Sequence, residues 1–268
     1  MNSTIAAHPT PAGRSLALLE RHRRSLIGLG AFAVLVVGWQ IIAMTQPPYI
    51  FPSLVKVLAD IWRFALDGIL LQATLVTAKS VVIGATTSMI VGTLIGFALA
   101  RFESFTAPLL NFVQTVPYVV WALMAMIWFG LSQFSVVFTI FVAAFPIVSF
   151  NVAAGLKQVD GHLVGMAQSL RANRYMTLRH IVLPSLTPYL LSAARTMFGM
   201  CWKIVVLAEL FAGGGGGGGV GYNLYAGWEF NRTNEVFAWT VWLVFLMMLT
   251  EWLVVMPIER FATRWKKA

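Results

Sequence analysis

Long apolar stretches with almost no charge are the feature that most constrains this fold. Residues 26–44 and 80–100 contain no charged side chain. An α-helix needs about 20 such residues to cross the roughly 30 Å hydrocarbon core of a bilayer. The chain of 268 residues is 59% hydrophobic and 11% charged, whereas a soluble domain carries about 25% charged residues. We therefore expect an all-α, polytopic membrane protein that is covered by lipid.

The apolar stretches predict six membrane-spanning helices. Their expected bounds are residues 26–44, 80–100, 105–131, 134–156, 181–211 and 236–258. They form a transmembrane domain over residues 25–258, between a cytoplasmic N-terminal segment at 1–24 and a cytoplasmic tail at 259–268. Residues 54–66 show a helical apolar period but carry too much charge to span, so we expect them to lie on the outer interface.

Small residues and prolines shape two of these spans. Small side chains recur every four residues along the second span, at Gly84, Ser88, Gly92, Gly96 and Ala100. Such a stripe lets another helix approach closely, which matters because lipid provides no hydrophobic driving force for helix association. In the third span, Pro117 removes a backbone donor and should kink the helix.

The distribution of basic residues orients the chain. The net charge is +9, but the Lys and Arg residues gather at the chain ends, at Arg101 and in the loop 157–180, and we expect no binding of nucleic acid. With six spans these segments fall on one side of the membrane, which the positive-inside rule makes cytoplasmic. The apolar run 26–44 is longer than that of a typical signal peptide, so we expect it to remain as the first span.

Catalytic and cofactor motifs are missing from the sequence. Cys201 is the single cysteine, so no internal disulfide forms, and the four histidines lack metal-ligand spacing. The spans contain no paired catalytic carboxylates and no Ser/His set. The glycine run Gly213–Gly219 is not followed by the Lys-Ser or Lys-Thr of a phosphate-binding loop. We expect a flexible external loop there, no ATP or metal bound by this chain, and no enzyme activity.

Ionisable side chains within the spans are candidates for a transport pathway. Arg195, Lys203 and Glu209 lie in the expected fifth span, and Lys79 lies at the outer end of the second. A charge at the bilayer centre costs at least about 2.5 kcal/mol, so it usually faces a water-filled cavity or a partner. These residues either line a pathway that favours anions or serve the structure. In the structural alternative Arg195 pairs with an acid, Lys79 reaches the interface and Glu209 caps the next loop.

The basic loop 157–180 predicts two short amphipathic helices on the cytoplasmic face. Asp160 is a plausible helix N-cap, and an apolar stripe runs from Leu163 to Leu170. Residues 171–173 interrupt the pattern, with an asparagine that tolerates a left-handed turn, before a second stripe begins at Tyr175. Such a helix pair either lies on the bilayer or fills a groove in a partner, and the pattern alone leaves both possibilities open.

The same loop carries residues that resemble a known family. Permease subunits of bacterial binding-protein-dependent ABC importers share the signature Glu-Ala-Ala, three residues, Gly, nine residues and Ile-x-Leu-Pro. Here Gly165–Ala167 stands at the triplet and Arg171 at the glycine, while Ile181–Pro184 matches the end. Other segments resemble the family's later spans and C-terminal end: Asn111–Pro117, Met126–Gly130, Phe145, Pro146, Asn151, Gly155, Arg195, Trp202, Glu209, Gly219–Gly221, Ile258–Phe261 and Trp265. The chain resembles the branch that includes nitrate, taurine, alkanesulfonate and bicarbonate permeases.

The resemblance implies a type I ABC importer permease with a cytoplasmic coupling loop, in a bacterial inner membrane. It implies two ATPase subunits that bind ATP and magnesium, and a second permease copy in a homodimer. It also implies a periplasmic or lipid-anchored substrate-binding protein that delivers a small anionic solute. The ATPase-docking residues it implies are Leu163, Gly165, Ala167, Leu170, Arg171, Asn173, Arg174 and Tyr175. An ion-gradient-driven secondary transporter is the alternative function, because it would also use intramembrane charges and broken helices.

Overall fold

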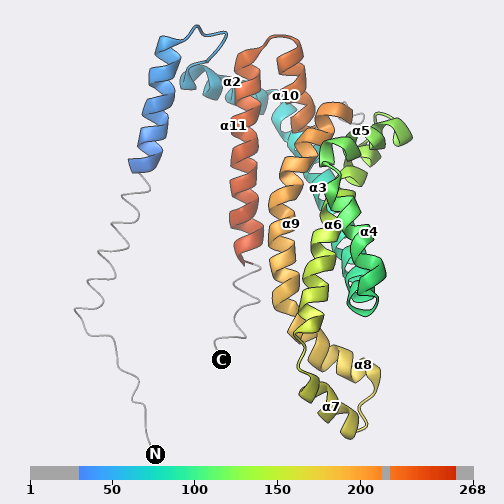
Figure 1. The fold of residues 1–268 in the computed structure, drawn as a ribbon. Coiled ribbons are helices and arrows are strands. Elements are labelled where there is room, and N and C mark those ends of the chain that lie inside the picture. Colours follow the sequence, from blue (N-terminus) through green and yellow to red (C-terminus); the bar gives the residue numbers. More distant parts are fainter. Residues whose placement is uncertain (1–29, 213–217, 258–268) are drawn as a thin grey trace, which may run out of the picture. The chain divides into compact units, whose positions relative to one another are not determined.

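The computed structural model describes residues 30–212 and 218–257 (Figure 1). Every regular element in these ranges is a helix, which confirms the all-α expectation. The chain divides into two compact units, Met1–Ala59 and Asp60–Ala268, and each is considered by itself. Four of the described helices are long and apolar enough to cross a membrane, and a bent pair of helices brings the number to five.

The first unit contains the apolar helix Gly30–Thr45 and the start of helix α2 (Leu54–Leu66). The chain folds back after the first helix, because the Trp39 indole N–H donates to the carbonyl oxygen of Pro52 at 3.1 Å. Helix α2 has the bounds that the helical period predicts. Residues 26–29 of the expected first span lie outside the described residues.

Helices α3 (Ile69–Arg101) and α6 (Gln133–Lys157) pack closely in the second unit. A Cβ atom added at Gly84 would lie 2.6 Å from Ile140, and one at Gly96 would lie 2.6 Å from Val152. Glycine is therefore required for this approach, as the small-residue stripe predicts. The Ser149 hydroxyl adds a hydrogen bond to the backbone oxygen of Gly92, at 3.0 Å.

The expected third span is two helices, α4 (Glu103–Thr115) and α5 (Tyr118–Phe129), bent by 89°. The sequence predicts a kinked helix at Pro117, and the structure shows a sharp break there. Val116 adopts an extended backbone with ψ 121°, because the residue before a proline is disfavoured in the helical region. The Trp121 indole N–H donates to the Val113 carbonyl oxygen at 3.2 Å across the break.

Helix α9 (Leu183–Ala212) packs along α6, and two further helices follow it. These are α10 (Val220–Glu229), which the sequence pattern does not predict, and α11 (Thr233–Thr250), which continues as the π-helical segment η3 (Glu251–Val255). Residues 213–217 of the expected glycine loop and residues 258–268, including the tail, lie outside the described residues.

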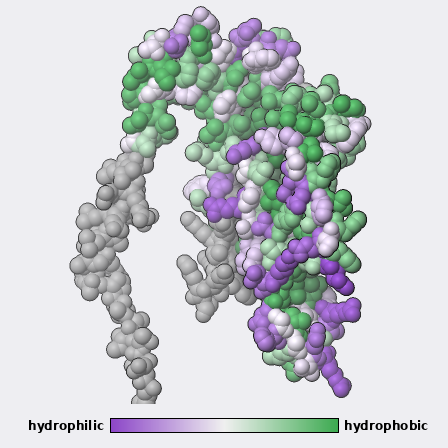
Figure 2. Space-filling model, in the orientation of Figure 1, coloured by the Kyte–Doolittle hydropathy of each residue, from purple (hydrophilic) through white to green (hydrophobic). Residues whose placement is uncertain are grey.

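The end of the second unit that carries α7 (Gly161–Ser169) and α8 (Arg174–Thr177) also holds the turn between α3 and α4. The Lys157 ammonium contacts both carboxylate oxygens of Glu103 at 2.8 Å and ties these segments together. Figure 2 shows hydrophilic residues gathered at this end and hydrophobic residues over much of the visible face above it. Arg101 and the loop 157–180 thus share one end, as the topology requires.

Candidate functional site

The loop that projects beyond α6 and α9 is one short helix and the beginning of a second, long one. Helix α7 starts at its N-cap Asp160, whose carboxylate accepts from the backbone N–H of His162 at 2.8 Å. Asn173 caps α8 by accepting from the N–H of Met176 at 2.7 Å. The sequence predicts two separate short helices, but the second is continuous through a π-helical turn with α9, so one helical body runs over Arg174–Ala212.

Arg171 forms the corner between α7 and α8 in a left-handed backbone conformation, with φ 54°. The corner is closed by the N–H of Ala172, which donates to the carbonyl oxygen of Ala167 at 2.9 Å. The sequence pattern predicts the left-handed turn at Asn173, but the structure has it at Arg171, and Asn173 has φ −73°. Arg171 is the position at which the family signature has glycine, the residue that adopts this conformation without strain.

Most of the expected docking side chains are presented to the surroundings. Leu170 is 75% exposed and Tyr175 is 63% exposed, although both side chains are large and mainly apolar. The exposed members of the set are Leu163, Gly165, Leu170, Arg171, Asn173, Arg174 and Tyr175. Ala167 differs, because it is 8% exposed and supports the corner from inside. An apolar and basic surface of this kind is suited to filling a groove in another protein.

A polar stripe runs along the exposed face of the spanning helix α9. Its members recur at helical spacing and are Ser192, Arg195, Thr196 and Lys203. The Arg195 guanidinium lies 3.4 Å from a carboxylate oxygen of Glu251, which supplies the acid that the structural alternative for Arg195 requires. Both side chains stay partly accessible, at 52% and 38%. Among the described residues, Lys203 has no ion-pair partner.

A small cavity of about 60 Å³ lies beside this ion pair, between α9 and the end of α11. Thr250 and Glu251 line it from one side and Trp202 and Gly199 from the other. The Trp202 indole N–H is buried and finds no acceptor among the described protein atoms. A buried N–H normally has a partner, so the cavity offers a donor and a carboxylate to a water molecule, for which its volume is sufficient.

Glu209 is separate from the stripe and lies in a buried hydrogen-bonded cluster. Its side chain is 1% exposed, and its carboxyl oxygens accept from the Thr77 hydroxyl at 2.9 Å and from the Gly221 N–H at 2.8 Å. The Thr77 hydroxyl accepts in turn from the Val220 N–H at 2.8 Å. Three helices, α3, α9 and α10, therefore meet at one carboxyl group. The expected role of Glu209 as a cap for the following segment fits this geometry.

Thr77 is not predicted from the sequence, because it precedes the expected second span at residues 80–100, whereas α3 already includes it. Gly219 was noted as part of the family pattern, and the structure gives its reason. A Cβ atom there would clash with the carboxyl group of Glu209. Helix α10 can reach the cluster because its N-cap Gly219 and its second residue Gly221 carry no side chain.

Lys79 lies apart from the α9 stripe, in a cavity of about 500 Å³ between α3 and α6. Gln133 and Thr87 are the other polar side chains of this cavity, and its remaining walls are aromatic and aliphatic. The structure thus brings Arg195 into contact with Glu251, places Lys203 on the same face of α9, and separates Lys79 and Glu209 from them.

Comparison with known proteins gives the family. Residues 88–264 match the family described as binding-protein-dependent transport system inner membrane component. The transport permease protein SsuC of Bacillus subtilis (strain 168) is 29% identical over 247 residues, which cover 90% of this chain and 88% of that protein. The taurine transport system permease protein TauC of Escherichia coli (strain K12) is 26% identical over 253 residues, covering 91% and 90%. The nitrate import permease protein NrtB of Leptolyngbya laminosa is 24% identical over 251 residues, covering 88% of each chain.

Solved structures share the fold. A chain of the MetNI methionine ABC transporter, in an inward-facing conformation, superposes with a TM-score of 0.60 at 19% sequence identity. The match covers 73% of this chain and 96% of that chain. A helical membrane permease is therefore the architecture of this protein, and its family is a transport component whose ATPase is a separate subunit. The chain belongs to the binding-protein-dependent transport system inner membrane components, the permease subunits of ABC importers.

Proposed function

We propose that this permease forms a translocation pathway for a small anionic solute, delivered by a substrate-binding protein at the end opposite α7. The polar stripe of α9, with Arg195 and Lys203 on its exposed face, carries the proposal. A cationic side chain in a membrane span has an unfavourable free energy when it faces lipid. Contact with water and with a passing anion would offset that free energy. Relatives named for taurine and nitrate handle oxyanions, which supports a sulfonate, nitrate or related organic acid as the solute.

The individual residues have different parts in this proposal. Lys203 contacts the solute directly, because it has no competing acid among the described residues. Arg195 forms an ion pair with Glu251. The carboxylate balances the charge of the guanidinium and holds it at the pathway. Lys79 lines a separate cavity between α3 and α6, where it provides a second positive charge for an anion. Glu209 is buried and positions α10.

The working assembly in this proposal has two permease copies and two ATPase subunits in a bacterial inner membrane, with both termini cytoplasmic. ATP and magnesium are bound by the ATPase subunits and not by this chain. The exposed surface of α7 and α8, with Leu170, Arg171, Arg174 and Tyr175, docks in a groove of the ATPase. The end that holds this surface also carries Arg101, which agrees with a cytoplasmic location.

Uptake in reconstituted vesicles tests the pathway. The permease is assembled with its ATPase and binding protein, and uptake of nitrate, taurine and an alkanesulfonate is measured. Lys203→Gln should raise KM for the transported anion about tenfold or more, because a charge-assisted contact contributes about 1.5–3 kcal/mol. The double variant Arg195→Gln/Glu251→Gln removes the ion pair without leaving either charge alone. The control Arg232→Gln lies in the turn between α10 and α11, and unchanged uptake in both pathway variants would refute the proposal.

A charge reversal tests the docking surface independently. Arg171→Glu and Arg174→Glu should lower the number of solute molecules moved per ATP hydrolysed, while the protein still inserts and folds. Arg232→Glu is the matched control at the other end of the unit. Wild-type coupling in both loop variants would show that the surface of α7 and α8 does not receive the ATPase.

A further inference from the structure

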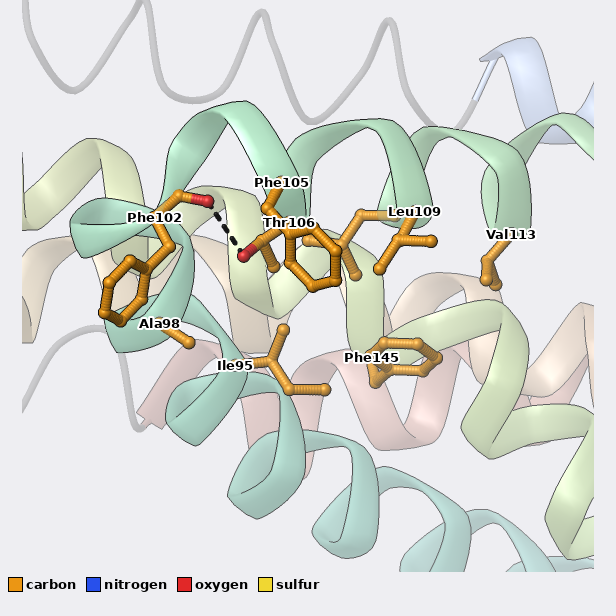
Figure 3. A pocket seen from close by; sticks show the side chains of 9 residues that line it. Ile95, Ala98, Phe102, Phe105, Thr106, Leu109, Val113 and Phe145 are labelled. Carbon is orange, nitrogen blue, oxygen red and sulfur yellow. Dashed lines mark hydrogen bonds between the residues drawn. The ribbon is translucent and has the colours of Figure 1, made fainter.

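An apolar groove of about 530 Å³ lies between the end of α3, helix α4 and α6 (Figure 3). Ile95 and Ala98 of α3 form one wall, Phe105 and Leu109 of α4 form another, and Phe145 comes from α6. These side chains are drawn in Figure 3 around a common space. The groove is comparable in volume to a small-molecule site, which typically has about 300–1,000 Å³.

The chemistry of the groove is that of hydrocarbon. Thr106 is its one polar lining side chain, and its hydroxyl already donates to the backbone oxygen of Phe102 at 3.0 Å. No charged side chain lines the wall. A polar solute needs a few precisely placed donors and acceptors for orientation. The only hydroxyl among the described residues that line this groove already donates its hydrogen to Phe102. Its occupant must therefore present an apolar chain.

The floor of the groove is firm. Leu99, Leu110 and Ala153 form a buried cluster from α3, α4 and α6, with exposures of 3%, 3% and 5%. Phe145 packs against the same cluster. The groove is thus built on packed side chains, so an occupant would not have to create it.

A positive charge lies beside Phe102, one of the residues that line the groove. The Arg101 guanidinium lies 5.2 Å from the ring centroid of Phe102, a groove residue. Glu103, the nearest acid in sequence, is engaged by Lys157 at 2.8 Å through both oxygens. In the described part of the chain, Arg101 makes no ion pair. An anionic amphiphile can use both features at once: its charged headgroup contacts Arg101, and its hydrocarbon chain lies in the apolar groove.

We propose that this groove binds one acyl chain of an anionic phospholipid, with the lipid phosphate against Arg101. The groove begins at the last turns of the spanning helix α3, where hydrocarbon gives way to headgroups. Basic residues at that level on the cytoplasmic side attract anionic lipid. Bilayer lipid is the surrounding solvent of this surface and always available to it. The lipid site does not depend on which solute is transported.

Lipid retention by the full-length permease tests this proposal. The protein is reconstituted in nanodiscs with equal amounts of phosphatidylglycerol and phosphatidylcholine, released in mild detergent, and the lipids that remain bound are counted by native mass spectrometry. The wild type should retain phosphatidylglycerol in preference to phosphatidylcholine. Arg101→Gln should weaken phosphatidylglycerol retention about fivefold, the equivalent of the roughly 1 kcal/mol that one basic side chain contributes near an anionic surface. Arg232→Gln is the matched control, because its guanidinium also lies over an aromatic ring, that of Phe230, at 5.5 Å.

A second pair of variants tests the groove itself. Ala98→Trp places an indole in the groove and should remove the retained lipid, whereas Leu94→Trp adds the same group at a 66% exposed position of α3 outside the groove. Ala98→Leu provides a smaller filling if the indole prevents folding. Equal retention of both lipids, or retention unchanged by Arg101→Gln and by filling at Ala98, would overturn the proposal. Loss of a permease dimer in Ala98→Trp with lipid retention unchanged would assign the groove to a second copy of the chain instead, and would also overturn it.

Discussion

Replacement of Glu209 by alanine should loosen the second unit at the point where three helices meet. The carboxyl group accepts from the Thr77 hydroxyl of α3 and from the Gly221 N–H of α10, while its own backbone belongs to α9. Because the side chain is 1% exposed, water cannot replace either bond without opening the packing. The change therefore tests whether a carboxyl group, and not apolar contact, holds α10 in place.

The size of the effect follows from the bonds that are lost. An unpaired buried donor costs about 1–3 kcal/mol, and Glu209→Ala leaves two of them in addition to a cavity. We expect a loss of about 3–5 kcal/mol in the free energy of unfolding. Glu209→Gln should lose only about 1–2 kcal/mol, because Oε2 lies within 3.0 Å of Thr77 and 2.8 Å of Gly221, so one amide oxygen at that position serves both donors.

A double-mutant cycle with Thr77→Val isolates the contact. Thr77→Val alone removes the donor to Glu209 and the acceptor of the Val220 N–H. The two substitutions together should cost less than the sum of the single changes, with a coupling of about 1–2 kcal/mol. Unfolding in mixed micelles, followed by circular dichroism as the denaturing detergent fraction rises, supplies the free energies.

The control for these measurements is Glu229→Ala, an exposed acid at the end of α10. It should change stability by less than about 0.5 kcal/mol. If Glu209→Ala behaves like Glu229→Ala, or if the cycle with Thr77→Val shows no coupling, the cluster does not hold α10 and the reasoning is wrong.

Four further substitutions have expected outcomes. Gly96→Ala should cost about 1–3 kcal/mol of stability, because its Cβ atom would lie 2.6 Å from Val152. The control Gly199→Ala, whose Cβ atom would meet no atom within 4 Å, should be neutral or stabilise the protein by up to about 1 kcal/mol. Equal effects of the two changes in the same unfolding assay would contradict the close packing of α3 on α6. Arg171→Gly should stabilise the loop by about 1 kcal/mol, because φ is 54° there, and hydrogen exchange in α7 should slow, an outcome that faster exchange would contradict. Trp202→Phe should cost about 1–3 kcal/mol, because it removes buried ring volume and the N–H donor to a water in the adjacent cavity, and a loss below about 0.5 kcal/mol would contradict a bound water there.

Local sequence rules predict much of this fold. The helical period of residues 54–66 predicts α2 with its observed bounds. The small residues that recur every four positions from Gly84 to Ala100 predict the close approach of another helix, which in the structure is α6. Asp160 caps α7 as its residue type suggests. In each case the signal is an interaction between residues close in sequence or a pattern on one face of a single helix. It can therefore be recognised without knowing which other helix packs against it.

The features that the sequence leaves undefined depend on tertiary contacts. Helix α10 carries no strong periodic signal, and its place is set by the bonds of Val220 to Thr77 and of Gly221 to Glu209, across 143 and 12 residues. The pairing of Arg195 with Glu251 joins residues 56 apart. The sequence offers an acid partner as one alternative for Arg195 but does not identify it, because the two residues lie on different helices. The break at Pro117 is predicted in position but not in angle, because tertiary packing sets the angle.

Continuity of the helix over Arg174–Ala212 bears directly on how an event at the loop reaches the pathway. Had α8 been a separate short helix, a push on Arg174 could be absorbed by the following turn. Instead α8 passes through the π-helical segment Leu178–Val182 into α9, without a non-helical residue. A π-helical segment inside a longer helix is uncommon and often lies at a functional site. In the proposed function, a displacement of α8 by the ATPase therefore moves Arg195 and Lys203 together, because both lie on the helix that α8 begins.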